Sequence, residues 1–189
     1  DEHLIQYSIA LASLWLADFD DVEAMNLQVA QTMSENDSFS DIYTLDHLFI
    51  KGQLSRFQGN FSIAQKTFTA LIDRLRQMQN SEYFIKANLA LAEIILERQY
   101  FEEKARKPNI ETGIALLTGL LKTNIGANGL INASVLSLLS SFYALQGDLD
   151  QAEQYMECAQ KEHALNPDAQ DQVRLIFAQA RVEGIKKQY

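Results

Sequence analysis

Hydrophobic residues recur along most of this chain at steps of three and four positions, the spacing that gathers side chains on one face of an α-helix. The stretch 147–159, which reads GDLDQAEQYMECA, shows this pattern most clearly. Gly147 suits the end of a helix because glycine tolerates the left-handed conformation, and an oxygen of Asp148 can accept hydrogen bonds from the first N–H groups of the next helix. The stretch therefore predicts a tight turn between two helices.

Three further segments resemble this turn and the helix that follows it. Each has an Asp or Asn, then an apolar residue, and then small and apolar residues at helical steps; they begin at Asp18, Asn60 and Asn109. The four copies lie 42, 49 and 39 residues apart. A repeat of this size cannot bury its apolar face alone, so we expect the repeats to stack.

These residues resemble the tetratricopeptide repeat family. The match in two repeats rests on Leu48, Gly52, Gly59, Phe61, Ala64 and Phe68, and on Leu136, Leu139, Tyr143, Gly147, Asp148, Leu149, Ala152, Met156 and Ala159. The spacings exceed the family's usual period of about 34 residues, so the chain looks more like the elongated arrays of bacterial regulatory and signalling proteins. The resemblance implies an all-α, right-handed superhelix, or solenoid, of antiparallel helix hairpins.

The predicted organisation is one domain, 1–189, with about four repeats and a last helix. The repeats are expected at roughly 3–36, 40–79, 81–124 and 127–165, and the last helix at 168–188. The charged insertion 98–107 is interpreted as a helix extension in preference to a docking loop. The last helix, with Val173, Ile176, Phe177 and Ala180 on one face, is either a cap or the first half of another repeat.

Composition favours a stable globular protein. A chain of 189 residues, 47% of them hydrophobic, can bury about 70% of its unfolded surface. The one cysteine, Cys158, excludes an intramolecular disulfide, and its place on the predicted packing face favours a buried thiol. No apolar run is long enough to span a bilayer, and no signal stretch opens the sequence. A cytoplasmic protein is expected, unless the sequence, which begins at Asp1, is cut from a membrane-anchored or exported protein.

The net charge of −9 is concentrated near the N-terminus. Residues 1–50 hold ten acidic side chains and no Lys or Arg, whereas residues 51–189 hold fifteen acidic and sixteen basic ones. Phosphate binding needs clustered cations, so no direct contact with nucleic acid and no membrane insertion are expected. The acidic excess is interpreted as favouring solubility over a basic partner.

The sequence contains no motif that indicates catalysis. A Gly-rich phosphate loop, a His-Glu-x-x-His zinc motif, a paired Cys-x-x-Cys and a Gly-x-Ser-x-Gly elbow are all missing. His3, His47 and His163 lie on different predicted helices, so no metal site is expected. We therefore predict that the chain is not an enzyme and needs no cofactor.

In arrays that resemble this one, the first helices of successive hairpins line a concave groove. Carried over to this sequence, the partner-binding candidates are Asp46, Phe49, Gln53, Arg56, Lys86, Asn88, Ser134, Ser137 and Ser141. The Lys and Asn residues with which some tetratricopeptide domains clamp a C-terminal carboxylate are missing, since Phe49 and Gln53 stand where that clamp would begin.

The resemblance thus implies a protein-interaction scaffold that binds a peptide or helix of a partner in this groove. The alternative is a sensory or regulatory ligand-binding module of a larger signalling or transcription-regulating protein. Self-association through the ends of the solenoid is a further expectation.

Overall fold

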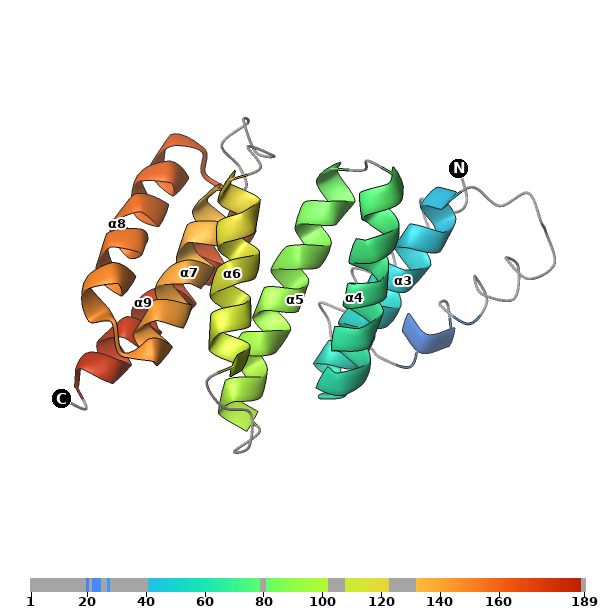
Figure 1. Ribbon diagram of the computed structural model, residues 1–189, viewed down its shortest axis with the longest axis horizontal. Coiled ribbons are helices and arrows are strands. Elements are labelled where there is room, and N and C mark those ends of the chain that lie inside the picture. The colour runs from blue at the N-terminus through green and yellow to red at the C-terminus, as the bar shows by residue number, and fades with distance from the viewer. Residues whose placement is uncertain are drawn as a thin grey trace. The chain divides into compact units, whose positions relative to one another are not determined.

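The computed structural model describes residues 20, 22–24, 27, 41–78, 81–101, 108–122 and 132–187. All named elements in this part of the chain are α-helices (Figure 1): α3 (Asp41–Phe57), α4 (Phe61–Met78), α5 (Ser81–Phe101), α6 (Pro108–Lys122), α7 (Asn132–Gln146), α8 (Leu149–Leu165) and α9 (Ala169–Lys186). The expectation of an all-α fold is confirmed for these residues. Most of the first predicted repeat, 3–36, lies outside them, and so do residues 102–107 of the predicted insertion.

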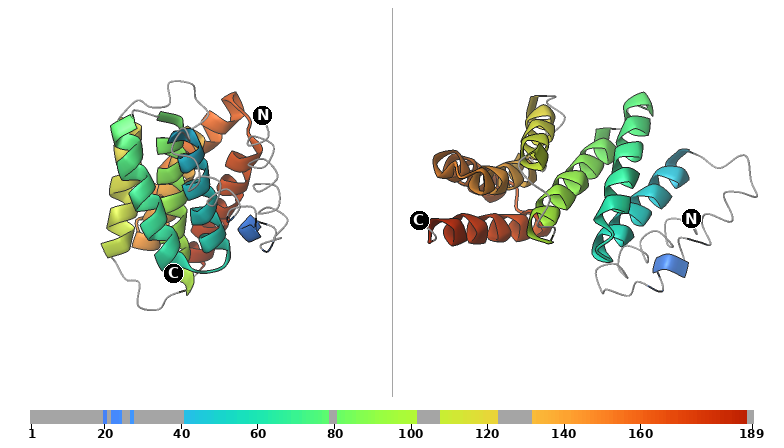
Figure 2. Two further views of the ribbon diagram at one scale, coloured as in Figure 1. Left: turned by 90° about the vertical axis from the view of Figure 1, so that its right-hand side faces the viewer. Right: turned by 60° about the horizontal axis from the view of Figure 1, so that its bottom comes forward.

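The chain divides into two compact units, Asp1–Ile94 and Ile95–Tyr189, which are described separately. Helix α5 runs through the boundary. In the first unit, α3 packs against α4. In the second, α7 contacts α6, α8 and α9, and α8 also contacts α9 (Figures 1 and 2). The predicted single domain and solenoid stay predictions.

The two glycine turns inferred from the sequence are present. Gly59 and Gly147 have φ values of +76° and +88°, in the left-handed region that favours glycine. The turn at Gly147 is closed by a hydrogen bond from the Asp148 N–H to the Tyr143 carbonyl, 3.0 Å. The Asp148 side chain then accepts from the N–H of Gln151 at 3.1 Å and caps α8. This short connection places α8 alongside α7.

A glycine lets two helices approach closely in each unit. A Cβ atom at Gly52 of α3 would lie 2.6 Å from Phe68 Cε2 of α4. A Cβ atom at Gly113 of α6 would lie 2.2 Å from Phe142 Cζ of α7. Both distances are far below normal contact, so each phenylalanine ring fills the space that the glycine leaves.

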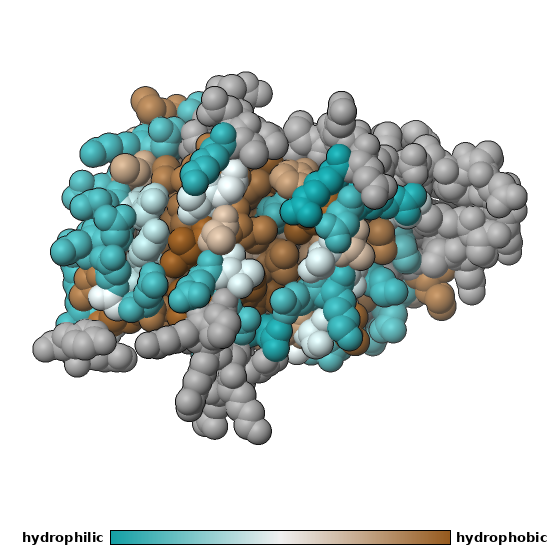
Figure 3. Space-filling model, in the orientation of Figure 1, coloured by the Kyte–Doolittle hydropathy of each residue, from teal (hydrophilic) through white to brown (hydrophobic). Residues whose placement is uncertain are grey.

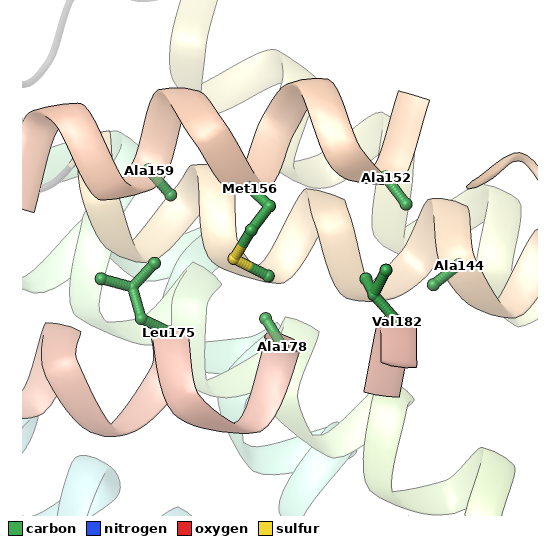
Figure 4. Close-up of a cluster of buried hydrophobic side chains, with 7 residues drawn as sticks. All are labelled: Ala144, Ala152, Met156, Ala159, Leu175, Ala178 and Val182. Carbon is green, nitrogen blue, oxygen red and sulfur yellow. The ribbon is translucent and has the colours of Figure 1, made fainter. Parts of the chain in front are cut away.

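The core of the second unit forms where α7, α8 and α9 meet. Figure 4 shows its buried side chains: Ala144, Ala152, Met156, Ala159, Leu175, Ala178 and Val182. Most of them are small, which allows the three helices to pack closely around Met156 and Leu175. On the surface, hydrophilic residues cover much of the face drawn in Figure 3, with apolar residues between them.

The structure corrects one expectation for this unit, the buried thiol, and shows which face of α9 is buried. Cys158 is exposed, because the buried stripe of α8 runs through Ala152, Met156 and Ala159 and position 158 points away from it. In α9 the buried side chains are Asp171, Leu175, Ala178 and Val182, while the apolar face noted in the sequence, Val173, Ile176, Phe177 and Ala180, is exposed.

Candidate protein-binding surface

The first candidate surface lies where α3 and α5 meet in the first unit. Its members project at helical steps from the two helices: Asp46, Gln53 and Arg56 from α3, and Tyr83, Lys86 and Glu93 from α5. We call these six residues the α3–α5 face. Four of them, Asp46, Gln53, Arg56 and Lys86, are among the residues expected to bind a partner.

Arg56 and Glu93 form an ion pair that links the two helices. Their side chains are 15% and 14% exposed, so water screens the pair only partly. Nη1 of Arg56 also lies 3.5 Å from Oε1 of Gln53, one turn earlier on α3. The guanidinium group is therefore held in a defined position at the surface.

A hydrogen bond links the same helices near the start of α5. The Tyr83 hydroxyl donates to Oδ1 of Asp46, which is buried. The Tyr83 ring also meets the edge of Phe49, with ring centroids 6.2 Å apart, and carries the Lys86 ammonium 5.7 Å above its own centre. Tyr83 thus contacts the buried Asp46 carboxyl group through its hydroxyl and the exposed Lys86 ammonium through its ring.

The candidates on α5 point in different directions. Lys86 is exposed, whereas Asn88 is buried and donates from Nδ2 to the Phe84 carbonyl at 2.6 Å. Two positions along a helix differ by about 200° in direction, so these two residues cannot share a face. Phe49 is also part of the core, edge-on to Phe68 with ring centroids 5.5 Å apart.

The three serine candidates are covered by α9 in the second unit. Ser134, Ser137 and Ser141 are all buried. The Ser134 hydroxyl donates to Oδ1 of Asp171, and Arg174 donates to Ser134 Oγ at 2.9 Å. We call the contact formed by these serines with Asp171, Arg174 and Arg181 the α7–α9 seam.

The other two serine hydroxyls donate hydrogen bonds to backbone carbonyl groups of α7, the helix to which they belong. Ser137 donates to the Ala133 carbonyl at 2.7 Å, and Ser141 donates to the Ser137 carbonyl at 3.1 Å. Arg181 adds a hydrogen bond to Ser141 Oγ at 3.1 Å. A serine whose hydroxyl bonds back to its own helix needs no water or other partner for that hydroxyl. Helix α9 can therefore lie directly over these small side chains.

Asp171 is the charged residue of the seam that is most completely enclosed. Its Oδ2 atom is buried and has no hydrogen-bond partner among the described residues. Burial raises the pKa of this carboxyl, an effect that the Ser134 hydroxyl and then the Arg174 guanidinium oppose. The seam therefore holds a carboxyl group whose charged form is disfavoured.

In both units, polar contacts between two helices join residues at nearly the same separation in sequence. The pairs Asp46–Tyr83, Arg56–Glu93 and Ser134–Asp171 are each 37 residues apart. The contacts of Ser134 with Arg174 and of Ser141 with Arg181 each span 40 residues. Helices α3 and α5, and likewise α7 and α9, are thus paired in a similar register.

The sequence argument missed five residues of these two contacts: Tyr83, Glu93, Asp171, Arg174 and Arg181. A signal for them was available. Tyr83 and Glu93 lie three and seven positions from Lys86, on its face of the helix. Arg174 and Arg181 are seven residues apart, and so are Ser134 and Ser141. This equal spacing allows the two arginines of α9 to face the two serines of α7.

Six of the nine candidates are buried, and their side chains contact the chain itself. The three with side-chain surface are Gln53, Arg56 and Lys86. Over the described ranges, no group of three or more His, Cys, Asp and Glu side chains could hold a metal ion. None of the helices described is both long and apolar enough to cross a membrane.

Comparison of the chain with protein-family models, with curated proteins and with solved structures found no match.

Proposed function

We propose that this chain is a tetratricopeptide-like helical-repeat scaffold that binds a peptide or helix of another protein on the α3–α5 face. The observation that carries the proposal is the common register of 37 to 40 residues between first helices in both units. A repeated register is what stacked hairpins need in order to present one side of successive helices as a continuous surface.

The α3–α5 face is the better candidate of the two contacts because it keeps accessible, oriented polar groups. Arg56 is held by Glu93 and Gln53, and the Lys86 ammonium lies over the Tyr83 ring. Groups positioned before binding lose little conformational freedom when a partner arrives. Lys86 offers N–H donors to carboxylate or carbonyl oxygens of a bound segment.

The test compares two charge reversals in the same unit. Lys86→Glu changes the α3–α5 face, whereas Lys66→Glu changes an exposed lysine of α4. Proteins captured from a lysate of the source cells by the wild-type chain are identified, and their affinities are then measured with purified components. We expect a partner that loses at least about tenfold in affinity with Lys86→Glu and is unaffected by Lys66→Glu.

Equal affinity of every purified partner for the two variants would contradict the proposal. Phe49→Ala is unsuitable for this test because Phe49 is a core residue, and truncating a buried phenylalanine costs about 3–5 kcal/mol. Its loss of binding would reflect unfolding and not the removal of a contact.

A further inference from the structure

Helix α9 carries a second apolar face, opposite the face that packs on α7 and α8. Val173, Ile176 and Phe177 are 46%, 59% and 60% exposed, and Ala180 is exposed as well. Their steps of three, one and three place them on one side of the helix. The buried residues, such as Leu175 and Val182, lie on the other side.

The register of the α7–α9 seam indicates which residues of α7 correspond to the exposed apolar residues of α9. Ser134 pairs with Asp171, an offset of 37 residues. With this offset, Val173, Ile176, Phe177 and Ala180 of α9 correspond to Leu136, Leu139, Ser140 and Tyr143 of α7. The exposed face of α9 is therefore the counterpart of a specific face of α7.

Helix α8 covers that face of α7. The Ser140 hydroxyl donates to the Ala152 carbonyl at 2.7 Å, and the Tyr143 ring stacks on Tyr155 with centroids 5.3 Å apart. Leu136 packs against the cluster that contains Ala152 and Met156. We propose that the exposed face of α9 binds an amphipathic helix of a partner protein, which would run along α9 as α8 runs along α7.

The side chains on the exposed face of α9 also indicate which residues the bound helix should carry. Phe177 stands where α7 has the small Ser140, so the bound helix needs Ala or Gly opposite it, as α8 has Ala152 opposite Ser140. Ala180 stands where α7 has Tyr143, so a larger residue fits there. Arg181, at the edge of the face, takes the place of Ala144, and an acidic residue of the partner would complement it.

Charge argues for a partner protein over a second copy of this chain. Two α9 helices packed antiparallel through this face would bring the edges that carry Arg174 and Arg181 together, and like charges at an interface are unfavourable. A helix with an acidic edge has no such conflict. The site does not involve the α3–α5 face, so Lys86→Glu must leave it unchanged.

The probe is a labelled peptide with the sequence of α8, residues 149–165, carrying Cys158→Ser. A lactam between Glu157 and Lys161, which are exposed and one helical turn apart, keeps the peptide helical, because an isolated helix of this length is only marginally stable. Its binding to the full chain is followed by fluorescence anisotropy. We expect saturable binding that Phe177→Asp weakens at least about tenfold.

The matched control is Ile63→Asp, which removes an exposed isoleucine from α4 and should leave the affinity unchanged. Circular dichroism confirms that both variants fold, as expected for exposed positions. Absence of binding, or equal binding by wild type and Phe177→Asp, would overturn the proposal. Sedimentation that shows a wild-type dimer and a Phe177→Asp monomer would overturn it as well, since the occupant would then be a second copy.

Discussion

The α3–α5 contact of the first unit and the α7–α9 contact of the second join their helices in different ways. Helices α3 and α5 are linked through long side chains, in the pairs Arg56–Glu93 and Tyr83–Asp46. Helix α7 instead presents serines, and α9 lies over them. Helix α3 thus keeps Gln53 and Arg56 partly at the surface, whereas the serines of α7 become part of a helix interface.

This difference bears directly on binding. The α3–α5 face can exchange contacts for those of a partner at Gln53, Arg56 and Lys86, because these side chains keep surface that reaches water. The serine face cannot do so without displacing α9, which would expose Leu175, Ala178 and Val182 of the core. Residues in the two contacts therefore differ in how readily a partner could reach them.

The largest effect is expected from the glycine contact of the second unit. Gly113→Ala places a Cβ atom 2.2 Å from the Phe142 ring, and overpacking of this kind costs about 1–3 kcal/mol of unfolding free energy. Gly52→Ala, with 2.6 Å to Phe68, should cost less. Urea unfolding of the two variants measures both values.

Gly119→Ala is the control in the same helix as Gly113. Nothing lies within 4 Å of the added Cβ atom, so the helix gains about 0.5–1 kcal/mol from the better helix former. A Gly113→Ala protein as stable as Gly119→Ala would show that α6 and α7 do not approach closely.

The ion pair of the first unit is expected to come next. Arg56→Ala leaves Glu93 partly buried without this partner, and we expect a loss of about 2 kcal/mol in unfolding free energy. A double-mutant cycle with Glu93→Ala isolates the coupling between the two side chains. The control pair is Asp73 and Arg76, 3.0 Å apart and more than half exposed, whose coupling should stay below about 0.5 kcal/mol. Equal coupling in the two pairs would refute the structural role of Arg56.

A smaller effect should distinguish two serines of the α7–α9 seam. Ser134→Ala removes a hydrogen bond to the buried Asp171 carboxylate and should cost about 1 kcal/mol. Ser137→Ala removes only a bond to a carbonyl of the same helix, so its effect should lie within about 0.5 kcal/mol. Thermal and urea unfolding measure the difference, and a larger loss for Ser137→Ala would contradict the contact assigned to Ser134.

The helix boundaries were predictable because local chemistry sets them. Asp148 and Asp168 accept hydrogen bonds from the N–H groups that begin α8 and α9, and the glycine turns have the backbone angles that glycine favours. Such signals act over a few residues and can be read from the sequence. The stripes of α4 and α8 were equally clear, since each helix has one continuous apolar face.

The packing of α9 could not be predicted in the same way. The helix has two apolar faces at helical spacing, one through Leu175 and Val182 and one through Ile176 and Phe177, and periodicity does not say which of them meets a neighbour. Serine is similarly ambiguous. It can contact water, or it can bond back to its own helix as Ser137 does and lie inside an interface.

The weakest expected effect is a pH dependence of the second unit. Burial raises the pKa of Asp171 in the folded chain, so its contribution to stability is complete below the unfolded value of about 4 and is lost as the pH rises through the raised value. Asp171→Asn does not titrate. The stability of wild type relative to this variant should therefore fall as the pH rises above about 4, as measured by urea unfolding at each pH. A rise would contradict the burial of the carboxyl.

The most direct test compares how accessible two of the expected partner-binding positions, 86 and 137, are to a reagent in solution. In a Cys158→Ser background, Lys86→Cys and Ser137→Cys each provide a single thiol, and the rate of reaction with a small thiol reagent is measured under native conditions. The thiol at position 86 should react as an exposed cysteine does, and that at position 137 at least about 100-fold more slowly, because it reacts only when the structure opens. Equal rates would show that the serine face of α7 is open, and the distinction between the two contacts would fail.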